Sequence, residues 1–170
     1  MKKYFMIFVL VLICFNLAAC KNETAREDTG SFSSSDLDGN EVTESIFKDK
    51  DVTILNVWGT YCGPCLGEMP DLSTLSDSLP ENAQIIGMVI DVPEGDTEMI
   101  KTARKICEDN HITYRNIVMN ESIQEYLSGL EAVPTTFILD STGKAVCDPI
   151  IGAYVEKYKQ AVQEYLDQKQ

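Results

Sequence analysis

The sequence is poor in histidine, tryptophan and positive charge. It holds one histidine, one tryptophan and 14 Lys and Arg residues against 27 Asp and Glu, for a formal net charge of -13. Proteins that bind nucleic acid through its phosphates need a basic surface, so this charge argues against nucleic-acid binding. After the N-terminal apolar run, the sequence has no further run long enough to span a bilayer.

Length and composition are typical of one globular domain. A chain of 170 residues with 44% hydrophobic and 24% charged residues can bury one substantial core, and disorder of the whole chain is excluded. We expect this domain to be a monomer with a solvated, acidic surface.

The N-terminus has the pattern of a secretory signal. Met1-Lys2-Lys3 is positively charged, residues 4–17 are almost uninterrupted apolar sequence, and small residues then lead to Cys20. Leu17-Ala18-Ala19-Cys20 resembles a bacterial lipobox, which implies cleavage before Cys20 and a diacylglycerol on its sulfur. An uncleaved N-terminal anchor is the alternative.

This pattern divides the chain into three parts. Residues 1–19 are expected to be a lipoprotein signal peptide, and the polar residues 20–31 a flexible tether. Residues 32–170 are then the folded domain, anchored by lipid to the extracytoplasmic face of the cell membrane.

Apolar periodicity within that domain predicts alternating strands and helices. Asp38-Gly39-Asn40 predicts a hairpin between Phe32 and Val42. Strands are expected over 52–57, 85–90, 112–119, 135–139 and 145–151; helices are expected over 66–79, after Asp96 or Thr97, over 120–129 and over 154–166. Pro149 places the last strand at a sheet edge. The pattern indicates an α/β fold with a mixed sheet covered by helices on both faces.

Two cysteines follow the first of these strands. Cys62 and Cys65 stand three positions apart where a helix begins, so they can close a small disulfide ring. Free backbone N–H groups at a helix N-terminus favour a thiolate, which is the reactive form of cysteine. The arrangement suits reversible dithiol–disulfide exchange. Zinc would need two further ligands at similar spacing, and a purely structural bridge over so short a loop would add little stability.

The residues around these cysteines resemble the thioredoxin active site. The resemblance rests on W-x-x-x-C-G-P-C from Trp58 to Cys65, on Pro70 five residues later, and on Val133-Pro134-Thr135. The lipobox, the hairpin and an extra segment between Asp91 and Asn120 resemble, more narrowly, extracytoplasmic thiol–disulfide oxidoreductases of the TlpA/ResA type. This implies a thioredoxin-like fold with an N-terminal β-hairpin and an inserted helix–strand segment between the central strands.

Position and resemblance together assign the site residues. Cys62, exposed at the helix tip, is expected to attack, and Cys65, one turn further in, to resolve the mixed disulfide. The resemblance implies that the Val133–Pro134 peptide bond is cis and that these two residues form a surface against which the substrate chain lies. The substrate-contact surface is completed by Trp58, Tyr61, Gly63 and Pro64.

Glu68 is the third candidate catalytic residue. Thioredoxin has a buried aspartate at the position of Asn56, whereas Glu68 lies three residues after Cys65 and on the same side of the helix. Proteins of the TlpA/ResA type carry a functional glutamate there. Our hypothesis is that Glu68 handles the proton of Cys65; a solvated helical glutamate is the alternative.

The remaining cysteines and the histidine have no assigned role. Cys107 and Cys147 lie on apolar elements, so two buried free thiols are expected, although the even count permits a second disulfide. The resemblance places the two on opposite sides of the sheet. His111, near a helix end, is expected to be a surface or capping residue.

The resulting functional prediction is a reductase of disulfides in exported client proteins. It needs no metal and no cofactor beyond the redox-active disulfide Cys62–Cys65. The resemblance implies a membrane electron donor of the CcdA/DsbD type and clients with disulfides or oxidised cysteines. One alternative is a thiol peroxidase, which requires a PxxxTxxC motif. The other is a Sco-like copper-handling protein, which requires a CxxxC motif and a distant histidine.

Overall fold

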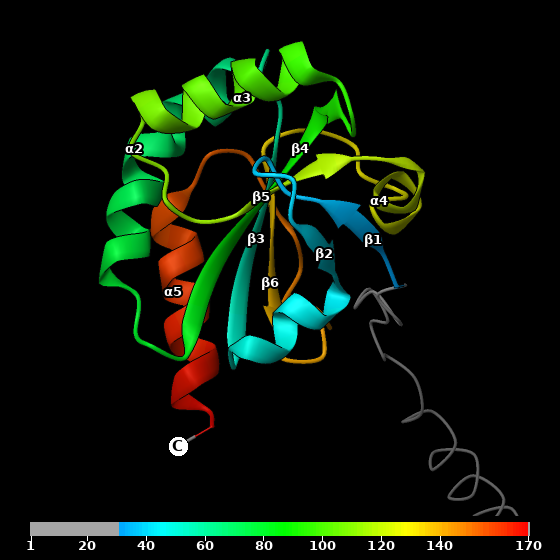
Figure 1. Ribbon diagram of the computed structural model, residues 1–170. Helices are drawn as coiled ribbons and strands as arrows, with labels where there is room; N and C mark the ends of the chain where they lie inside the picture. The colour runs from blue at the N-terminus through cyan, green and yellow to red at the C-terminus, as the bar shows by residue number, and fades with distance from the viewer. Residues whose placement is uncertain (1–30, 170) are drawn as a thin grey trace, which may run out of the picture.

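The computed structural model describes residues 31–169 (Figure 1). The predicted signal peptide, Cys20 and the tether up to residue 30 lie outside the described residues. The elements, in chain order, are β1 (Ser33–Ser35), β2 (Glu41–Thr43), the 3-10 helix η1 (Glu44–Asp49), β3 (Val52–Trp58), α2 (Gly63–Ser78), β4 (Ala83–Pro93), α3 (Thr97–Asp109), β5 (Asn116–Met119), α4 (Glu121–Tyr126), β6 (Thr135–Asp140), β7 (Ile150–Ile151) and α5 (Val155–Asp167).

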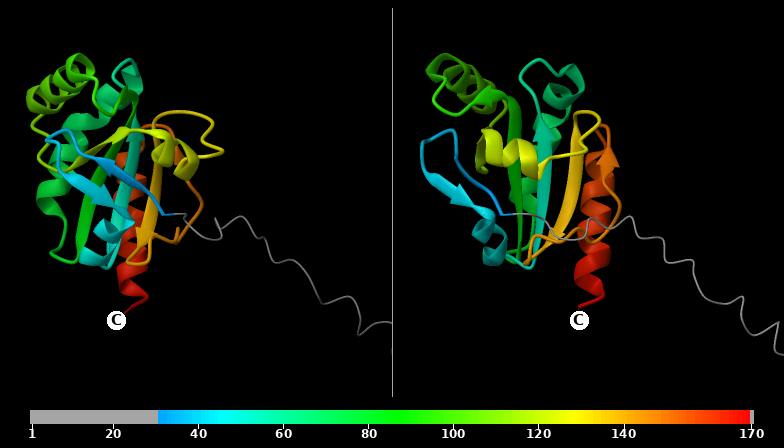
Figure 2. Two further views of the ribbon diagram at one scale, coloured as in Figure 1. Left: turned by 45° about the vertical axis from the view of Figure 1, so that its right-hand side comes forward. Right: turned by 90° about the vertical axis from the view of Figure 1, so that its right-hand side faces the viewer.

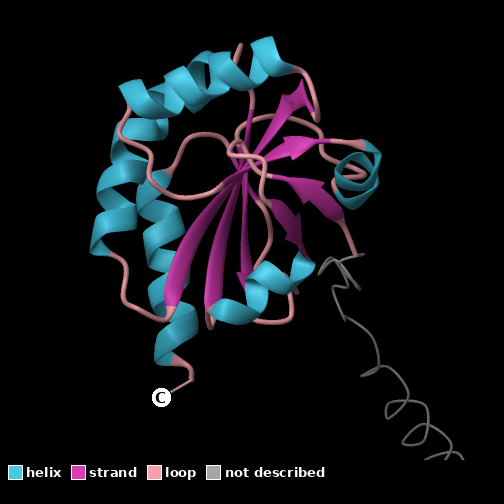
Figure 3. Ribbon diagram, viewed as in Figure 1, coloured by secondary structure: helices cyan, strands magenta, loops and turns pink. Residues whose placement is uncertain are grey.

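A five-stranded mixed sheet forms the centre of the molecule, as Figure 3 shows. The strand order is β5-β4-β3-β6-β7, with β3 parallel to β4 and antiparallel to β6. Every residue of β3 is buried, which agrees with its near-continuous apolar sequence. The predicted α/β class and mixed sheet are confirmed, and the middle strand is the one that leads into the two cysteines.

Helices cover both faces of this sheet (Figures 1 and 2). Helices α2 and α5 pack against each other on one face, where α5 also contacts β3 and β6. On the other face lie η1, α4 and the β1–β2 hairpin, around a core that includes Phe47, Leu55 and Tyr126. Helix α3 crosses the end of the sheet that lies opposite the C-terminus.

The predicted N-terminal hairpin is present and docks on the sheet. Strands β1 and β2 pair antiparallel, and Gly39 takes the positive φ of 81° that its turn requires. The Leu37 N–H donates to the Asn116 carbonyl at 2.9 Å, and the Ser34 hydroxyl donates to the Val118 carbonyl at 2.9 Å. The hairpin therefore covers the outer edge of β5.

The predicted helix–strand insertion corresponds to α3 and β5. Asp96 is the N-cap of α3, and its carboxylate accepts from the N–H groups of Glu98 and Met99 at 3.2 and 3.1 Å. Strand β5 begins at Asn116, four residues later than its apolar pattern predicted. Residues 112–115 form no strand and follow the turn after α3, in which His111 has a φ of 56° and an exposed side chain.

The last predicted strand is broken. Only Ile150 and Ile151 form β7, at the predicted sheet edge, while Ala145 makes an isolated bridge to Leu139. Pro149 has no N–H to give to a neighbouring strand, which explains why the pairing does not run on through it. Residues 31–169 contain no helix that is long and apolar enough to cross a membrane.

Candidate active site

The two predicted cysteines form a disulfide at the start of α2. Cys62 is the N-cap of the helix, and its sulfur accepts from the Cys65 N–H at 3.2 Å. Pro64 lies in the first helical turn, where the missing proline N–H would have no partner anyway. The sequence Cys-Gly-Pro-Cys thus places the Cys62 sulfur where a backbone N–H group of the helix donates to it.

The two sulfurs differ in exposure less than the sequence suggested. Cys62 is 6% exposed and Cys65 is 1% exposed. The order agrees with attack by Cys62 and resolution by Cys65, but the prediction of an exposed Cys62 is wrong. Its sulfur lies 3.6 Å from the carbonyl oxygen of Val133, so the loop across from the helix covers it.

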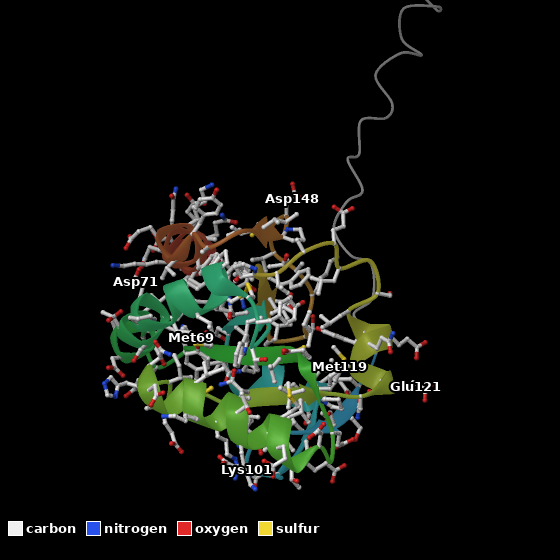
Figure 4. The ribbon with its side chains drawn as sticks, turned by 90° about the horizontal axis from the view of Figure 1, so that it is seen from above. Met69, Asp71, Lys101, Met119, Glu121 and Asp148 are labelled. Atoms are coloured by element: carbon white, nitrogen blue, oxygen red, sulfur yellow. A yellow bond between two sulfur atoms is a disulfide. The ribbon has the colours of Figure 1, made fainter. Side chains whose placement is uncertain are left out.

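That loop contains Val133 and Pro134, which were predicted to face the substrate. The Val133–Pro134 peptide bond is cis, as the resemblance implied. Pro134 is buried and Val133 is half-buried. The Pro134 carbonyl accepts from the Gly152 N–H at 2.8 Å, which joins the loop to the segment after β7. Figure 4 looks from above on this end of the sheet, with Asp148 labelled ahead of β7 and Met69 on α2.

The residues of the predicted contact surface differ in exposure. Tyr61 is 69% exposed, and Gly63 and Pro64 are exposed beside it, so all three can meet a substrate. Trp58 is different. It is 1% exposed, and its indole N–H donates to the Asn116 side-chain oxygen at 2.9 Å. A side chain this deeply buried does not fit the predicted contact with substrate. Its hydrogen bond instead joins β3 to β5 inside the core.

Asp91 fixes the turn that presents Cys62. Its carboxylate accepts from the Thr60 N–H at 2.9 Å and from the Thr60 hydroxyl at 2.5 Å. The sequence pattern did not predict this contact. The available signal was the position of Asp91, directly after the apolar run of residues 85–90, because the carboxyl ends of parallel strands are where such sites gather.

Glu68 is a buried carboxylate and not a solvated one. It is 4% exposed, and each of its two oxygens accepts one hydrogen bond. The Asn56 amide donates to Oε1 at 2.8 Å, and the Tyr158 hydroxyl donates to Oε2 at 2.9 Å. Burial raises the pKa of Glu68, while the two hydrogen bonds oppose that rise. Burial therefore favours the protonated form of Glu68 more than it is favoured in a solvated glutamate.

Four elements meet at this carboxyl. Asn56 comes from β3 and also donates to the Thr136 hydroxyl of β6 at 3.0 Å. Tyr158 comes from the face of α5 that meets the sheet. It packs there, fully buried. A buried tyrosine hydroxyl needs a polar partner, and that requirement was the signal for its second role.

The other two thiols are free, and they differ in exposure. Cys107 is buried, and burial raises its pKa to about 12. Cys147 was expected to be buried as well, but it is exposed. The reason is that residues 146–149 do not continue the strand that their apolar pattern predicted.

Alkylation should separate these two thiols. We expect iodoacetamide to label Cys147 in the native, oxidised protein and to leave Cys107 unlabelled until denaturant is added, because only the first is accessible. Peptide mapping by mass spectrometry gives the readout. Labelling of Cys107 at the same rate as Cys147 would contradict the assignment.

Metal ligands do not gather in the described part of the chain. Within residues 31–169 no three His, Cys, Asp or Glu side chains are grouped as a metal ion would require. His111 is exposed, as expected of a surface residue.

Known proteins share both the sequence and this architecture. The AhpC/TSA family model matches residues 25–146. The thiol-disulfide oxidoreductase ResA of Bacillus thuringiensis subsp. konkukian is 31% identical over 140 residues, which are 82% of this chain and 75% of that protein. ResA of Geobacillus thermodenitrificans is 30% identical over 65% of this chain and 60% of its own length.

Solved structures support the fold. The thioredoxin domain of a thiol-disulfide oxidoreductase from Bacteroides vulgatus has a TM-score of 0.67 at 19% identity, over 84% of this chain and 97% of that one. StoA from Bacillus subtilis has a TM-score of 0.61 at 19% identity, over 78% and 96%. With the disulfide in its CxxC motif, these matches lead to one assignment. The chain belongs to the AhpC/TSA family and is a ResA-like thiol–disulfide oxidoreductase with a thioredoxin-like fold.

Proposed function

We propose that the protein works as a reductase of exported client proteins, held on the extracytoplasmic face of the membrane by a lipid on Cys20. The observation that carries the reducing direction is the Gly63-Pro64 pair inside the disulfide ring. It resembles reducing members of the fold, whose potentials lie near about -270 mV, against about -120 mV for a strong oxidant. The lipobox supports the location.

The first step is attack on the client. The Cys62 thiolate bonds to one sulfur of the client disulfide, and the client disulfide bond breaks. The leaving client sulfur carries away the electron pair and takes a proton. The α2 N-terminus favours the thiolate form of Cys62, and the Val133-Pro134 loop faces it.

The second step is resolution by Cys65. Its thiol gives a proton to the Glu68 carboxylate, and its sulfur attacks Cys62. The Cys62–client bond breaks, the second client thiolate leaves, and the disulfide seen in the structure forms. Two electrons have passed to the client. The support for Glu68 as proton acceptor is its burial three residues after Cys65, together with its raised pKa.

A membrane dithiol donor of the CcdA/DsbD type would return the protein to its reduced form. A thiol peroxidase is less well supported, because the Thr60 hydroxyl, two residues before Cys62, is bonded to Asp91. The clients share one property, a disulfide or oxidised cysteine that can approach the surface around Tyr61 and Pro64.

Equilibration with dithiothreitol buffers tests the direction. We expect a reduction potential nearer about -270 mV than about -120 mV, together with reduction of insulin. Cys62→Ser is the inactive control. Cell fractionation tests the location: the protein should follow the membrane, and Cys20→Ala should release it. A strongly oxidising potential, or a lipid-free protein in the cytosol, contradicts the proposal.

A further inference from the structure

Tyr158 has more hydrogen-bond partners than its single hydroxyl proton can serve. The hydroxyl oxygen lies 2.9 Å from Glu68 Oε2, 2.7 Å from the Gly152 carbonyl oxygen and 3.1 Å from the Tyr154 nitrogen. The Tyr154 N–H donates to it. The Thr136 hydroxyl of β6 is a further hydrogen-bond neighbour of this side chain and acts as a donor to it. The proton of Tyr158 itself can go either to Glu68 or to Gly152, and both of these groups are acceptors when Glu68 is ionised.

The two choices match the two protonation states of Glu68. When Glu68 is a carboxylate, the Tyr158 proton points to Oε2. When Glu68 carries a proton on Oε2, that proton is donated to the tyrosine oxygen, and the hydroxyl turns to the Gly152 carbonyl. In either state the buried carboxyl keeps a partner, so neither state bears the penalty of an unpaired buried polar group.

We propose that Tyr158 is a positioning residue for dithiol exchange, whose hydroxyl turns between Glu68 and Gly152 as Glu68 takes up and releases the proton of Cys65. The inference rests on the proposed role of Glu68 and adds the residue that makes both of its states tolerable. It is a role outside the reacting atoms, since Tyr158 touches Glu68 and neither sulfur is among its hydrogen-bond partners.

Gly152 connects this movement to the loop that faces the client. Its N–H donates to the Pro134 carbonyl, and its own carbonyl accepts from Tyr158. Gly152 has a φ of 101°, and a Cβ there would lie 2.8 Å from the Tyr154 ring, so no other residue fits without a shift. Gly152 is thus hydrogen-bonded to the Val133-Pro134 loop through its N–H and to Tyr158, the partner of Glu68, through its carbonyl.

The groups that face Glu68 come from every element around it. Cys65 precedes it on α2, Tyr158 reaches it from α5, and Tyr114, just before β5, has its pKa raised by burial first and by Cys107 and Glu68 next. Asn56 from β3 and Thr136 from β6 are neutral. Among the described residues, the groups that favour the charged form of Glu68 are the hydrogen bonds from Asn56 and Tyr158.

The test is the pH profile of the resolution step in Tyr158→Phe. Reduced protein carrying Cys147→Ser, which removes the exposed third thiol, is mixed with one equivalent of Ellman's reagent. The second release of thionitrobenzoate, from the mixed disulfide on Cys62, reports attack by Cys65 in stopped flow. The hydrogen bond from Tyr158 to the ionised carboxylate is stronger than the one that Tyr158 accepts from the neutral acid, so its loss should raise the apparent pKa of this step by about one pH unit. Tyr165→Phe is the matched control, because Tyr165 lies on the same helix and contacts Lys169.

The outcomes separate this inference from the proposed role of Glu68. If Glu68→Gln removes the titration and Tyr158→Phe leaves it in place, the role of Tyr158 is overturned and that of Glu68 stands. If Glu68→Gln leaves the profile unchanged, the role of Glu68 fails and the inference fails with it. A shift in Tyr165→Phe equal to that in Tyr158→Phe also overturns it.

A second measurement leaves residue 158 unaltered, in case Tyr158→Phe does not fold. Infrared difference spectra across the titration of Glu68 should show the tyrosine C–O band moving together with the carboxyl band. Both changes should vanish in Glu68→Gln. If the tyrosine band stays fixed while Glu68 titrates, the Tyr158 hydroxyl does not change its partner and the inference is overturned.

Discussion

Replacing Cys65 with serine should stop turnover and leave the client covalently joined to Cys62. Cys65 is 1% exposed and bonded to Cys62, so it is the sulfur placed to release a mixed disulfide. A serine hydroxyl does not attack a disulfide under these conditions. Disulfide reduction should therefore fall to the uncatalysed background, while a first attack still occurs.

Mass spectrometry of adducts purified without reductant gives the measurement. Cys62→Ser should form no adduct, because it removes the attacking sulfur. Cys107→Ser is the matched control for loss of a buried cysteine, and it should keep wild-type turnover. Adducts found on Cys107 or Cys147 and absent from Cys62 would falsify the order of attack.

Changing Asn56 to aspartate should make stability depend steeply on pH. The Asn56 amide lies 2.8 Å from Glu68 Oε1, so Asn56→Asp places two carboxyls in contact in a buried site. Like charges at that distance cannot both ionise, so the folded protein must keep at least one proton. The carboxyls of the unfolded chain, by contrast, ionise at pKa values of about 3.9 and 4.3.

The sign follows from proton binding. Above the unfolded pKa values the folded state holds more protons than the unfolded state, so the free energy of unfolding falls as pH rises. The slope is about 1.4 kcal/mol per pH unit, which amounts to about 3 kcal/mol between pH 4.5 and pH 7. The wild-type protein has the same sign, since the pKa of Glu68 is raised.

Urea unfolding at several pH values measures this slope. The double variant Asn56→Asp with Glu68→Gln is the control, because it restores one carboxyl facing one amide and should remove most of the added slope. An Asn56→Asp variant whose stability does not change from pH 4.5 to pH 7 contradicts the buried contact.

The sequence predicted well those features that depend on one local pattern. Continuous apolar residues marked β3, Asp96 marked the start of α3, and the cysteine spacing marked the redox disulfide. Each of these signals lies within a few neighbouring residues. The position of Glu68 relative to Cys65 was predictable for the same reason, because helical spacing is regular.

Features that depend on distant partners were not predictable in this way. Trp58 looked like a surface residue of the active site until Asn116, 58 positions away, proved to be its partner. Tyr158 resembles any other apolar position of α5, and only its contact with Glu68, 90 positions away, gives it a further role. Cys147 is exposed because the chain stops pairing before Pro149.

The central place of β3 has a consequence for measuring the energetics of the disulfide. Amide protons of a fully buried middle strand exchange with solvent chiefly when the whole domain unfolds. Their exchange rates in the oxidised and reduced protein therefore give two global stabilities. The difference between these stabilities is the difference in reduction potential between the folded and unfolded chain, with 30 mV corresponding to about 1.4 kcal/mol. Deuterium uptake at β3 can thus report how far folding shifts the reduction potential of the Cys62–Cys65 disulfide.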